Sequence, residues 1–132
     1  VGAYVRGLGA GMAFSDWPLM DGALLPDVSG SRVRLVSYLH RLTAGLLLLY
    51  LGYLVLALRS LDGRWVRAGW WLLAVYSLQA VVGGLTVLTQ QGPVFRVGHV
   101  ALGALSWAIA FGAAYQASTQ NVASPVHLSP GP

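Results

Sequence analysis

The sequence predicts an all-α membrane protein, and two observations carry this prediction. Hydrophobic residues make up 56% of the 132-residue chain and charged residues only 9%, whereas a soluble domain usually has about a quarter charged residues. Three apolar stretches are also long enough to provide the about 20 helical residues that cross a bilayer core. Most of the surface of such a chain must therefore face lipid.

The three expected full spans run over residues 36–58, 68–88 and 94–117. A short apolar stub at residues 1–5 is expected to end a fourth span. We therefore interpret residues 1–117 as one helical membrane domain. Because the chain starts with Val1 rather than Met, we expect a fragment with an upstream span missing.

The segments outside the spans have a different composition. The first connection, residues 6–34, is rich in Gly, Pro, Asp and Ser and contains the sequence DWPLMDG, so we expect a loop at the membrane interface. The other two connections are short. Residues 118–132 are polar and rich in Ser and Pro, which predicts a linker or a disordered tail with His127 exposed to solvent.

The arginines predict an orientation. Residues 59–67 contain three arginines and the next connection contains only Arg96, so the positive-inside rule places residues 59–67 in the cytoplasm and the other two connections outside. Arg6, Arg32 and Arg34 in the first connection oppose this rule. We expect them to pair with nearby aspartates or an anionic ligand. The apolar surroundings favour lipid headgroups or an anionic cofactor as partners over nucleic acid.

His40 and His99 are the candidate functional centre. They lie about one turn into the first and third full spans, which run in the same direction, so the two imidazoles are expected at similar depth. Ionisable side chains within a span usually face the bundle interior. Two such imidazoles can ligate one iron ion from opposite sides, as in heme proteins. Alternatively, each histidine only forms a hydrogen bond with a neighbouring helix.

Small and basic residues near the histidines fit a heme site. Ala44 and Gly103 follow the two histidines at i+4, on the same helix faces, where a bulky side chain would collide with a macrocycle. Arg34, Arg41 and Arg96 lie near the same interface and are candidates for pairing with heme propionates. Zinc is disfavoured because the chain has no Cys or Glu to complete a tetrahedral set of ligands.

Other marked residues allow two interpretations. Asp16 and Trp17 are expected either to cover the outer face of a heme pocket or to be a turn aspartate and an interfacial tryptophan. Gln79, in mid-membrane, is expected to form an interhelical hydrogen bond rather than face a cofactor. The pair Gly83–Gly84 and the stripe Ala104–Ala108–Gly112 are expected to let helices pack closely.

Three segments, taken in order, carry a family resemblance. They are GAYVRGLGAGMAFSDWPLMDGALLP, YLHRLTAGLLLL and GGLTVLTQQGPVFRVGHVALGAL, and they resemble the amino-terminal half of heme A synthase from Gly2 to Trp107. The resemblance implies a transmembrane four-helix-bundle half, here three full spans plus the end of a fourth, whose partner is a second half bundle. It also implies that His40 and His99 are the axial ligands of heme b or of the substrate, heme O.

The implied activity is that of an oxidoreductase that converts a methyl group of heme O to the formyl group of heme A. The implied location is the plasma (inner) membrane of a prokaryotic cell, with the heme near the outer face. Terminal oxidase assembly factors or heme O synthase are the implied protein partners.

The chain departs from the family pattern in two places. Family members commonly have a Glu three residues before the first histidine, where this chain has Ser37, and a hydroxyl cannot act as a comparable base. Phe14 and Met20 stand where many members have loop cysteines. The alternatives are therefore a non-catalytic heme-binding or electron-transfer module of the same ancestry, or a cofactor-free membrane assembly subunit.

Overall fold

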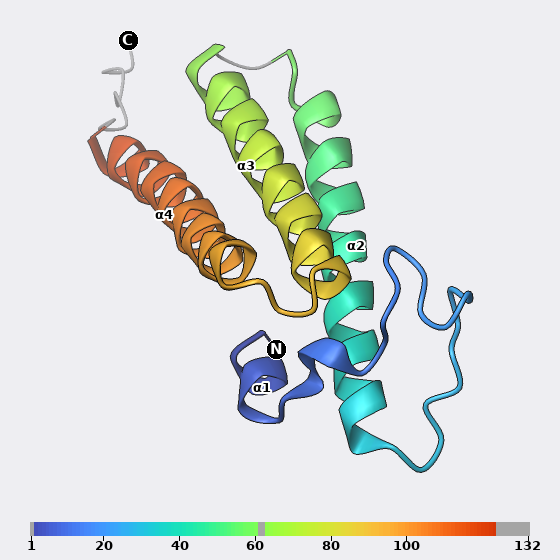
Figure 1. Cartoon of the computed structure of the whole chain (residues 1–132). Helices are drawn as coiled ribbons and strands as arrows, with labels where there is room; N and C mark the ends of the chain where they lie inside the picture. The colour runs from blue at the N-terminus through green and yellow to red at the C-terminus, as the bar shows by residue number, and fades with distance from the viewer. Residues whose placement is uncertain (1, 61–62, 124–132) are drawn as a thin grey trace, which may run out of the picture.

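The computed structural model describes residues 2–60 and 63–123, and these residues form helices and loops without a regular strand (Figure 1). The elements are α1 (Gly2–Gly7), the 3-10 helix η1 (Ala10–Met12), α2 (Arg32–Ala57), α3 (Gly63–Leu88) and α4 (Pro93–Ala123). The helices α2, α3 and α4 are each long and apolar enough to cross a membrane. The predicted all-α class with three full spans is therefore confirmed.

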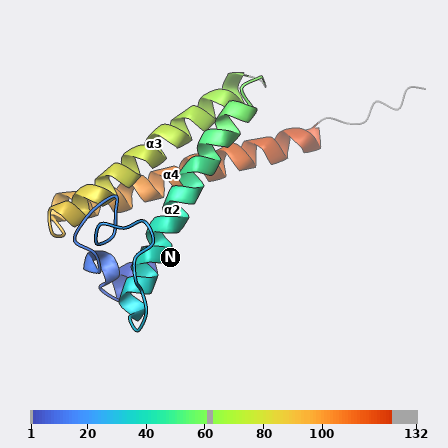
Figure 2. The same ribbon diagram turned by 90° about the vertical axis from the view of Figure 1, so that its right-hand side faces the viewer.

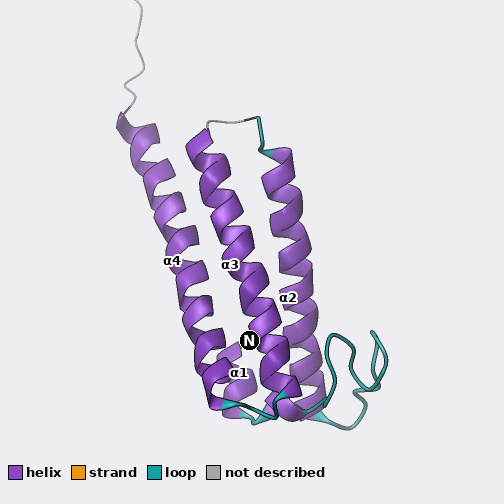
Figure 3. Ribbon diagram, turned by 45° about the horizontal axis from the view of Figure 1, so that its top comes forward, coloured by secondary structure: helices purple, strands orange, loops and turns teal. Residues whose placement is uncertain are grey.

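Helix α3 packs against both α2 and α4 and lies between them (Figure 3). The chain runs up α2, down α3 and up α4, so α2 and α4 are parallel. The start of α2, the end of α3 and the start of α4 meet at one end of the bundle, where α1 and the first loop also gather (Figure 2). This arrangement places residues early in α2 and early in α4 at the same level, as the sequence predicts.

Each helix is longer than its expected span. Helix α2 begins at Arg32 because the Oγ of Ser31 accepts a hydrogen bond from the Arg34 N–H at 3.3 Å and caps the helix. Helix α4 continues to Ala123, so residues 118–123 of the expected tail are helical. The hydroxyls of Ser118 and Thr119 donate to backbone carbonyls within the helix, which lets polar residues continue it. His127 lies outside the described residues.

Few side chains of the described residues are buried. One small apolar cluster, made by Val5, Ala10 and Val36, joins α1 and η1 to the start of α2. Large apolar side chains along the helices are exposed instead, including Trp107 at 78% and Phe111 at 72%. This distribution is expected where the surrounding solvent is lipid, because apolar side chains gain nothing by leaving it.

The small-residue stripe of α4 does not pack tightly against a neighbour. Ala108 and Gly112 line a groove of about 310 Å³ between α3 and α4, together with Arg64 and Trp65. Nothing lies within 4 Å of the position where a Cβ would be added at Gly112. Ala108 and Gly112 therefore do not bring α3 and α4 into close contact at these positions, and close packing of this stripe against another helix stays a prediction.

The first loop, residues 13–31, has a defined structure. Met20 and Ala23 exchange two backbone hydrogen bonds across a two-residue turn. The turn residues Asp21 and Gly22 have φ values of 54° and 76°, as in a type I′ turn, for which Asp-Gly is a favoured sequence. The carboxylate of Asp16 accepts hydrogen bonds from both turn N–H groups at 2.8 Å. The interpretation of Asp16 as a turn aspartate is confirmed.

Candidate imidazole site

The structure brings the two candidate histidines together. His40 on α2 and His99 on α4 have ring centroids 6.4 Å apart, and the ring planes are nearly perpendicular at 85°. A metal ion bound about 2 Å from one nitrogen of each ring would place the ring centres roughly 6 Å apart. The spacing of the two rings therefore fits one metal ion held between them.

The hydrogen bond of His99 leaves one of its nitrogens free to bind a metal. Its Nδ1 lies 2.9 Å from the backbone oxygen of Gln79. A carbonyl oxygen only accepts hydrogen bonds, so in the neutral imidazole Nδ1 carries the ring proton and Nε2 has the free lone pair. Histidines that ligate metals typically donate their other N–H in this way, which fixes the tautomer and the ring orientation.

Gly83 on α3 makes this position of the imidazole possible. A Cβ added at Gly83 would lie 2.8 Å from Cε1 of His99, closer than real Cβ contacts allow, and a tight 3.0 Å from its Nδ1. The sequence interpretation assigned the glycine pair to helix packing and missed this role. The only signal that could have found it is that Gly83 lies four residues after Gln79, the residue that orients His99.

A small cavity lies between the imidazoles. It is a partly open pocket of about 50 Å³ lined by His40, Ala44, Tyr76, Gln79, Ala80 and His99. Ala44 is thus where the sequence predicts it, whereas the lining by Tyr76 and Ala80 was not anticipated. Ligand pockets usually measure about 300 Å³ or more. A space of this size can hold a metal ion, and a porphyrin would require α2 and α4 to stand further apart.

Gly103 lies against protein rather than against the cavity. A Cβ added there would be 3.0 Å from Nε2 of Gln79. The same amide accepts a hydrogen bond through Oε1 from Ser106 Oγ at 3.3 Å. The predicted interhelical hydrogen bond of Gln79 is confirmed, and the space that Gly103 leaves is occupied by the Gln79 side chain instead of being open for a macrocycle.

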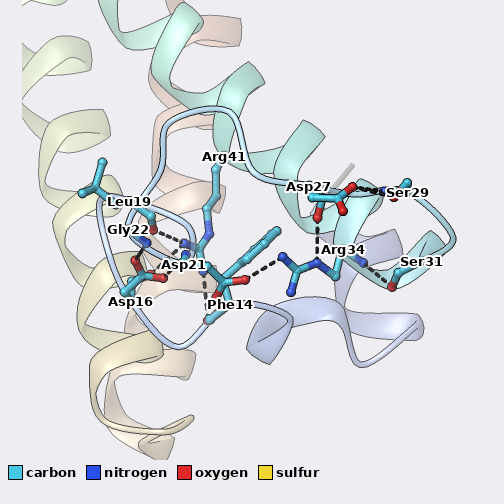
Figure 4. Close-up of polar contacts among 10 residues, drawn as sticks. All are labelled: Phe14, Asp16, Leu19, Asp21, Gly22, Asp27, Ser29, Ser31, Arg34 and Arg41. Carbon is cyan, nitrogen blue, oxygen red and sulfur yellow. Dashed lines mark hydrogen bonds and ion pairs between the residues drawn. The ribbon is translucent and has the colours of Figure 1, made fainter.

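Two of the three candidate arginines bind the first loop (Figure 4). Arg34 forms an ion pair with Asp21 at 2.6 Å and donates through Nε to the Asp27 backbone oxygen at 2.9 Å. The predicted pairing of this arginine with a nearby aspartate is confirmed. Arg41 donates to three backbone oxygens of the loop, those of Phe14, Asp16 and Leu19. Both guanidinium groups are therefore engaged by protein, while Arg96 is exposed on α4.

Trp17 reaches from the first loop to α3. A Cβ added at Gly84 would overlap its indole ring, at 2.7 Å from Cε2 and 2.8 Å from Cε3. The ring therefore rests directly on the backbone of α3, one residue from the glycine that accommodates His99. Trp17 remains 37% exposed, which also suits the interfacial tryptophan of the second interpretation.

Ser37 lies one helical turn before His40 and is buried, with 3% of its surface exposed. Its neighbour Val36 belongs to the cluster with Val5 and Ala10. Among the described residues, no group of three or more His, Cys, Asp or Glu side chains could hold a metal ion. The two imidazoles are thus the donor set that the described part of the chain offers at this level.

Comparisons with known proteins give one consistent result. Residues 1–111 match the COX15-CtaA family model, described as cytochrome oxidase assembly protein. Heme A synthase from Bradyrhizobium diazoefficiens is 36% identical over 129 residues, which cover 83% of this chain and 34% of that protein. Heme A synthase from Rhodopseudomonas palustris strain BisB5 is 37% identical over 116 residues, covering 78% and 32%.

A third relative, heme A synthase from Sinorhizobium fredii, is 36% identical over 124 residues, covering 83% of this chain and 34% of that protein. The chain therefore spans about a third of the length of the curated relatives it matches. No solved structure gave a significant match.

Proposed function

The chain belongs to the COX15-CtaA family of cytochrome oxidase assembly proteins, the family of heme A synthase, and on this premise we propose that it binds heme between His40 and His99. The observation that carries the proposal is the geometry of the pair. The rings are 6.4 Å apart, and the Nδ1 of His99 donates to a backbone carbonyl, so its Nε2 is free to ligate.

Each residue at this site has a separate role in the proposed heme binding. His40 and His99 would hold the iron from opposite sides, Gly83 admits the His99 ring, and Ala44 keeps the cavity open on the α2 side. When bound, heme supplies the redox chemistry of its iron. Because the pocket is small, we infer that heme binding requires α2 and α4 to separate.

For the whole protein we propose the reaction after which its relatives are named, the synthesis of heme A. In this reaction a methyl group of heme O is oxidised to a formyl group: water supplies the formyl oxygen, the electrons pass to an external acceptor and the protons are released to solvent. We place the site near the outer face of a bacterial inner membrane, by the arginine distribution. Heme O synthase and oxidase assembly factors are the partners that this chemistry implies.

One observation favours a second candidate function. Ser37 is a buried hydroxyl where the family commonly has a carboxylate, and a serine does not replace a carboxylate as a base. A non-catalytic heme-binding or electron-transfer module of the same ancestry would keep the imidazole pair and need no carboxylate. Heme binding is common to both candidates, so it is the property to test first.

The test is a titration of the purified full chain with hemin in detergent. We expect a Soret band typical of low-spin iron with two imidazole ligands, and we expect His40→Ala or His99→Ala to abolish the low-spin form. His127→Ala is the matched control, since it removes a histidine from the polar tail. A wild-type chain without a Soret band, or histidine variants with an unchanged spectrum, would overturn the proposal.

The two candidate functions are separated by the product. The protein, expressed with heme O synthase in cells that lack their own heme A synthase, should convert heme O to heme A, as measured by mass spectrometry of extracted hemes. Heme binding without heme A would favour the non-catalytic module. If the Ser37→Glu variant forms heme A and the wild-type protein does not, then the absence of a carboxylate at residue 37 explains the inactivity of the wild type.

A further inference from the structure

We propose that the groove between α3 and α4 binds a phospholipid with an anionic headgroup, with the phosphate at Arg64 and an acyl chain along α4. The groove lies at the end of the bundle opposite α1, where α2 ends and α3 begins (Figure 1). The two imidazoles lie toward the other end, early in α2 and α4. The groove is therefore separate from the proposed heme site, and its ligand is a component of the membrane itself.

The lining of the groove changes from polar to apolar along its length. Arg64 is the second residue of α3, and the antiparallel α4 brings Gln116 to the same level; both side chains line the groove. Deeper in the bundle the lining includes Ala68 on α3 and Ala108 and Gly112 on α4. From Gln116 back to Ala108 the groove follows α4 for about 12 Å, at 1.5 Å per residue. A phospholipid has the same order of polar and apolar parts.

Small side chains keep the groove open. Nothing lies within 4 Å of the position where a Cβ would be added at Gly112, and Ala68 and Ala108 contribute only methyl groups. The groove measures about 310 Å³, whereas sites for small molecules usually measure about 300–1,000 Å³. Acyl chains are as apolar as these walls, and they are the solvent of a bundle that crosses the bilayer. A lipid chain therefore suits the deeper part of the groove.

Positive charge at the mouth of the groove selects the headgroup. Residues 59–67 contain three arginines and one aspartate, Asp62, and the side chains of Arg59 and Arg67 are exposed. The Cζ of Arg64 lies 5.2 Å from the ring centroid of Trp65, which also lines the groove, so a cation–π contact holds this guanidinium at the mouth. A guanidinium matches the geometry of a phosphate group, and tryptophan suits the headgroup level.

The predicted orientation agrees with this choice of ligand. The positive-inside rule predicts that residues 59–67 lie in the cytoplasm. The cytoplasmic leaflet carries anionic lipids, and basic pockets between membrane helices on that side bind their headgroups. A zwitterionic lipid such as phosphatidylcholine has no net charge, so it gains less from the arginines. We therefore expect phosphatidylglycerol to bind more tightly than phosphatidylcholine.

Photo-cross-linking of the wild-type full chain in nanodiscs tests which molecule occupies the groove. The probe is a trace of phosphatidylglycerol with a diazirine on its acyl chain, and mass spectrometry of peptides locates the cross-links. We expect them to concentrate at residues 64–68 and 108–116 in phosphatidylcholine nanodiscs and to decrease there in phosphatidylglycerol nanodiscs. Cross-links spread evenly over the three long helices, or absent from the groove because protein fills it, would overturn the proposal.

Two substitutions test the headgroup and the acyl chain separately, by native mass spectrometry of the full chain with either lipid added in detergent. Arg64→Gln should weaken binding of phosphatidylglycerol about fivefold and leave that of phosphatidylcholine unchanged, because one arginine contributes about this factor near anionic lipid. Gly112→Leu should abolish the tight binding of phosphatidylglycerol, because the leucine side chain fills the groove. The open space around Gly112 lets the helices keep their positions.

Each substitution has a matched control. Arg96→Gln removes an exposed arginine of α4 at the opposite end of the bundle. Gly52→Leu adds the same side chain at a similar distance along α2, where nothing lies within 4 Å of the added Cβ. Both controls should bind phosphatidylglycerol like the wild type.

Binding of phosphatidylglycerol that is unchanged in Gly112→Leu would overturn the groove as the site. Binding that is unchanged in Arg64→Gln, or equal for the two lipids in the wild type, would overturn the selection of an anionic headgroup. If a variant fails to fold, the cross-linking of the wild-type chain still decides whether the lipid lies in the groove. None of these measurements involves heme, so their outcome does not depend on the proposed function.

Discussion

Substituting alanine for Gly83 should weaken heme binding without destabilising the protein. The added Cβ would lie 2.8 Å from Cε1 of His99, and ordinary contact begins at 3.4 Å, so the ring must retreat by about 0.6 Å. A displacement of that size along the bond from Nδ1 to the Gln79 oxygen, now 2.9 Å, would take it beyond normal hydrogen-bond length.

The magnitudes separate the two effects. Losing the hydrogen bond costs about 0.5–1.5 kcal/mol, which is offset by the about 1 kcal/mol that alanine gains over glycine inside a helix. Thermal stability should therefore change little. Disturbing the partner that orients a metal-ligating histidine typically lowers metal affinity about 10- to 100-fold. We expect a heme dissociation constant raised by that factor.

The assay is the hemin titration of Gly83→Ala beside Gly45→Ala, together with thermal unfolding of both. Gly45 lies in α2 in open surroundings and controls for the change in helix propensity alone. If Gly83→Ala binds heme like the wild type, with the same spectrum, then Gly83 does not position the ring of His99, and the role assigned to this glycine is refuted.

Three further predictions concern the loop and the helices. The pKa of Asp16 lies below its ordinary value of 3.8, mainly because the N–H of Gly22 and that of Asp21 donate to the carboxylate. The stabilisation from this group is thus present above pH 3.8 and lost as the pH falls through the lowered pKa; an NMR titration of the Gly22 amide with a midpoint at or above 3.8 would contradict this. Ser31→Ala should cost about 1 kcal/mol in unfolding free energy by removing the cap of α2, and an unchanged unfolding midpoint would speak against the cap. Gln79→Leu should cost about 0.6 kcal/mol by breaking the bond to Ser106, with no added effect when Ser106→Ala is already present.

Much of the fold could be predicted because it depends on local properties of the chain. Hydropathy over about 20 residues decides whether a segment crosses the bilayer, so the three spans follow from composition and length alone. The same direction of α2 and α4 follows from counting spans, and it brings His40 and His99 to the same level. The Asp21–Gly22 turn follows from the backbone preferences of two residues.

Other features depend on which surfaces meet, and the sequence alone does not reveal this. The sequence makes Arg41 a candidate partner of heme propionates, and this stays a prediction. It gives no sign that Arg41 donates to loop carbonyls, because every residue has a backbone carbonyl. The motifs Gly83–Gly84 and Ala104–Ala108–Gly112 both consist of small residues within a helix, so the sequence gives them the same interpretation. In the structure Gly83 and Gly84 are covered by two aromatic rings, while Gly112 borders open space.

The sequence by itself thus determined the membrane character, the three spans and the pairing of the two histidines, because hydropathy and helix direction are properties of single segments. Only the tertiary structure decided which nitrogen of His99 is free, which glycine admits its ring and what holds the first loop, because each of these depends on contacts between residues far apart in the chain.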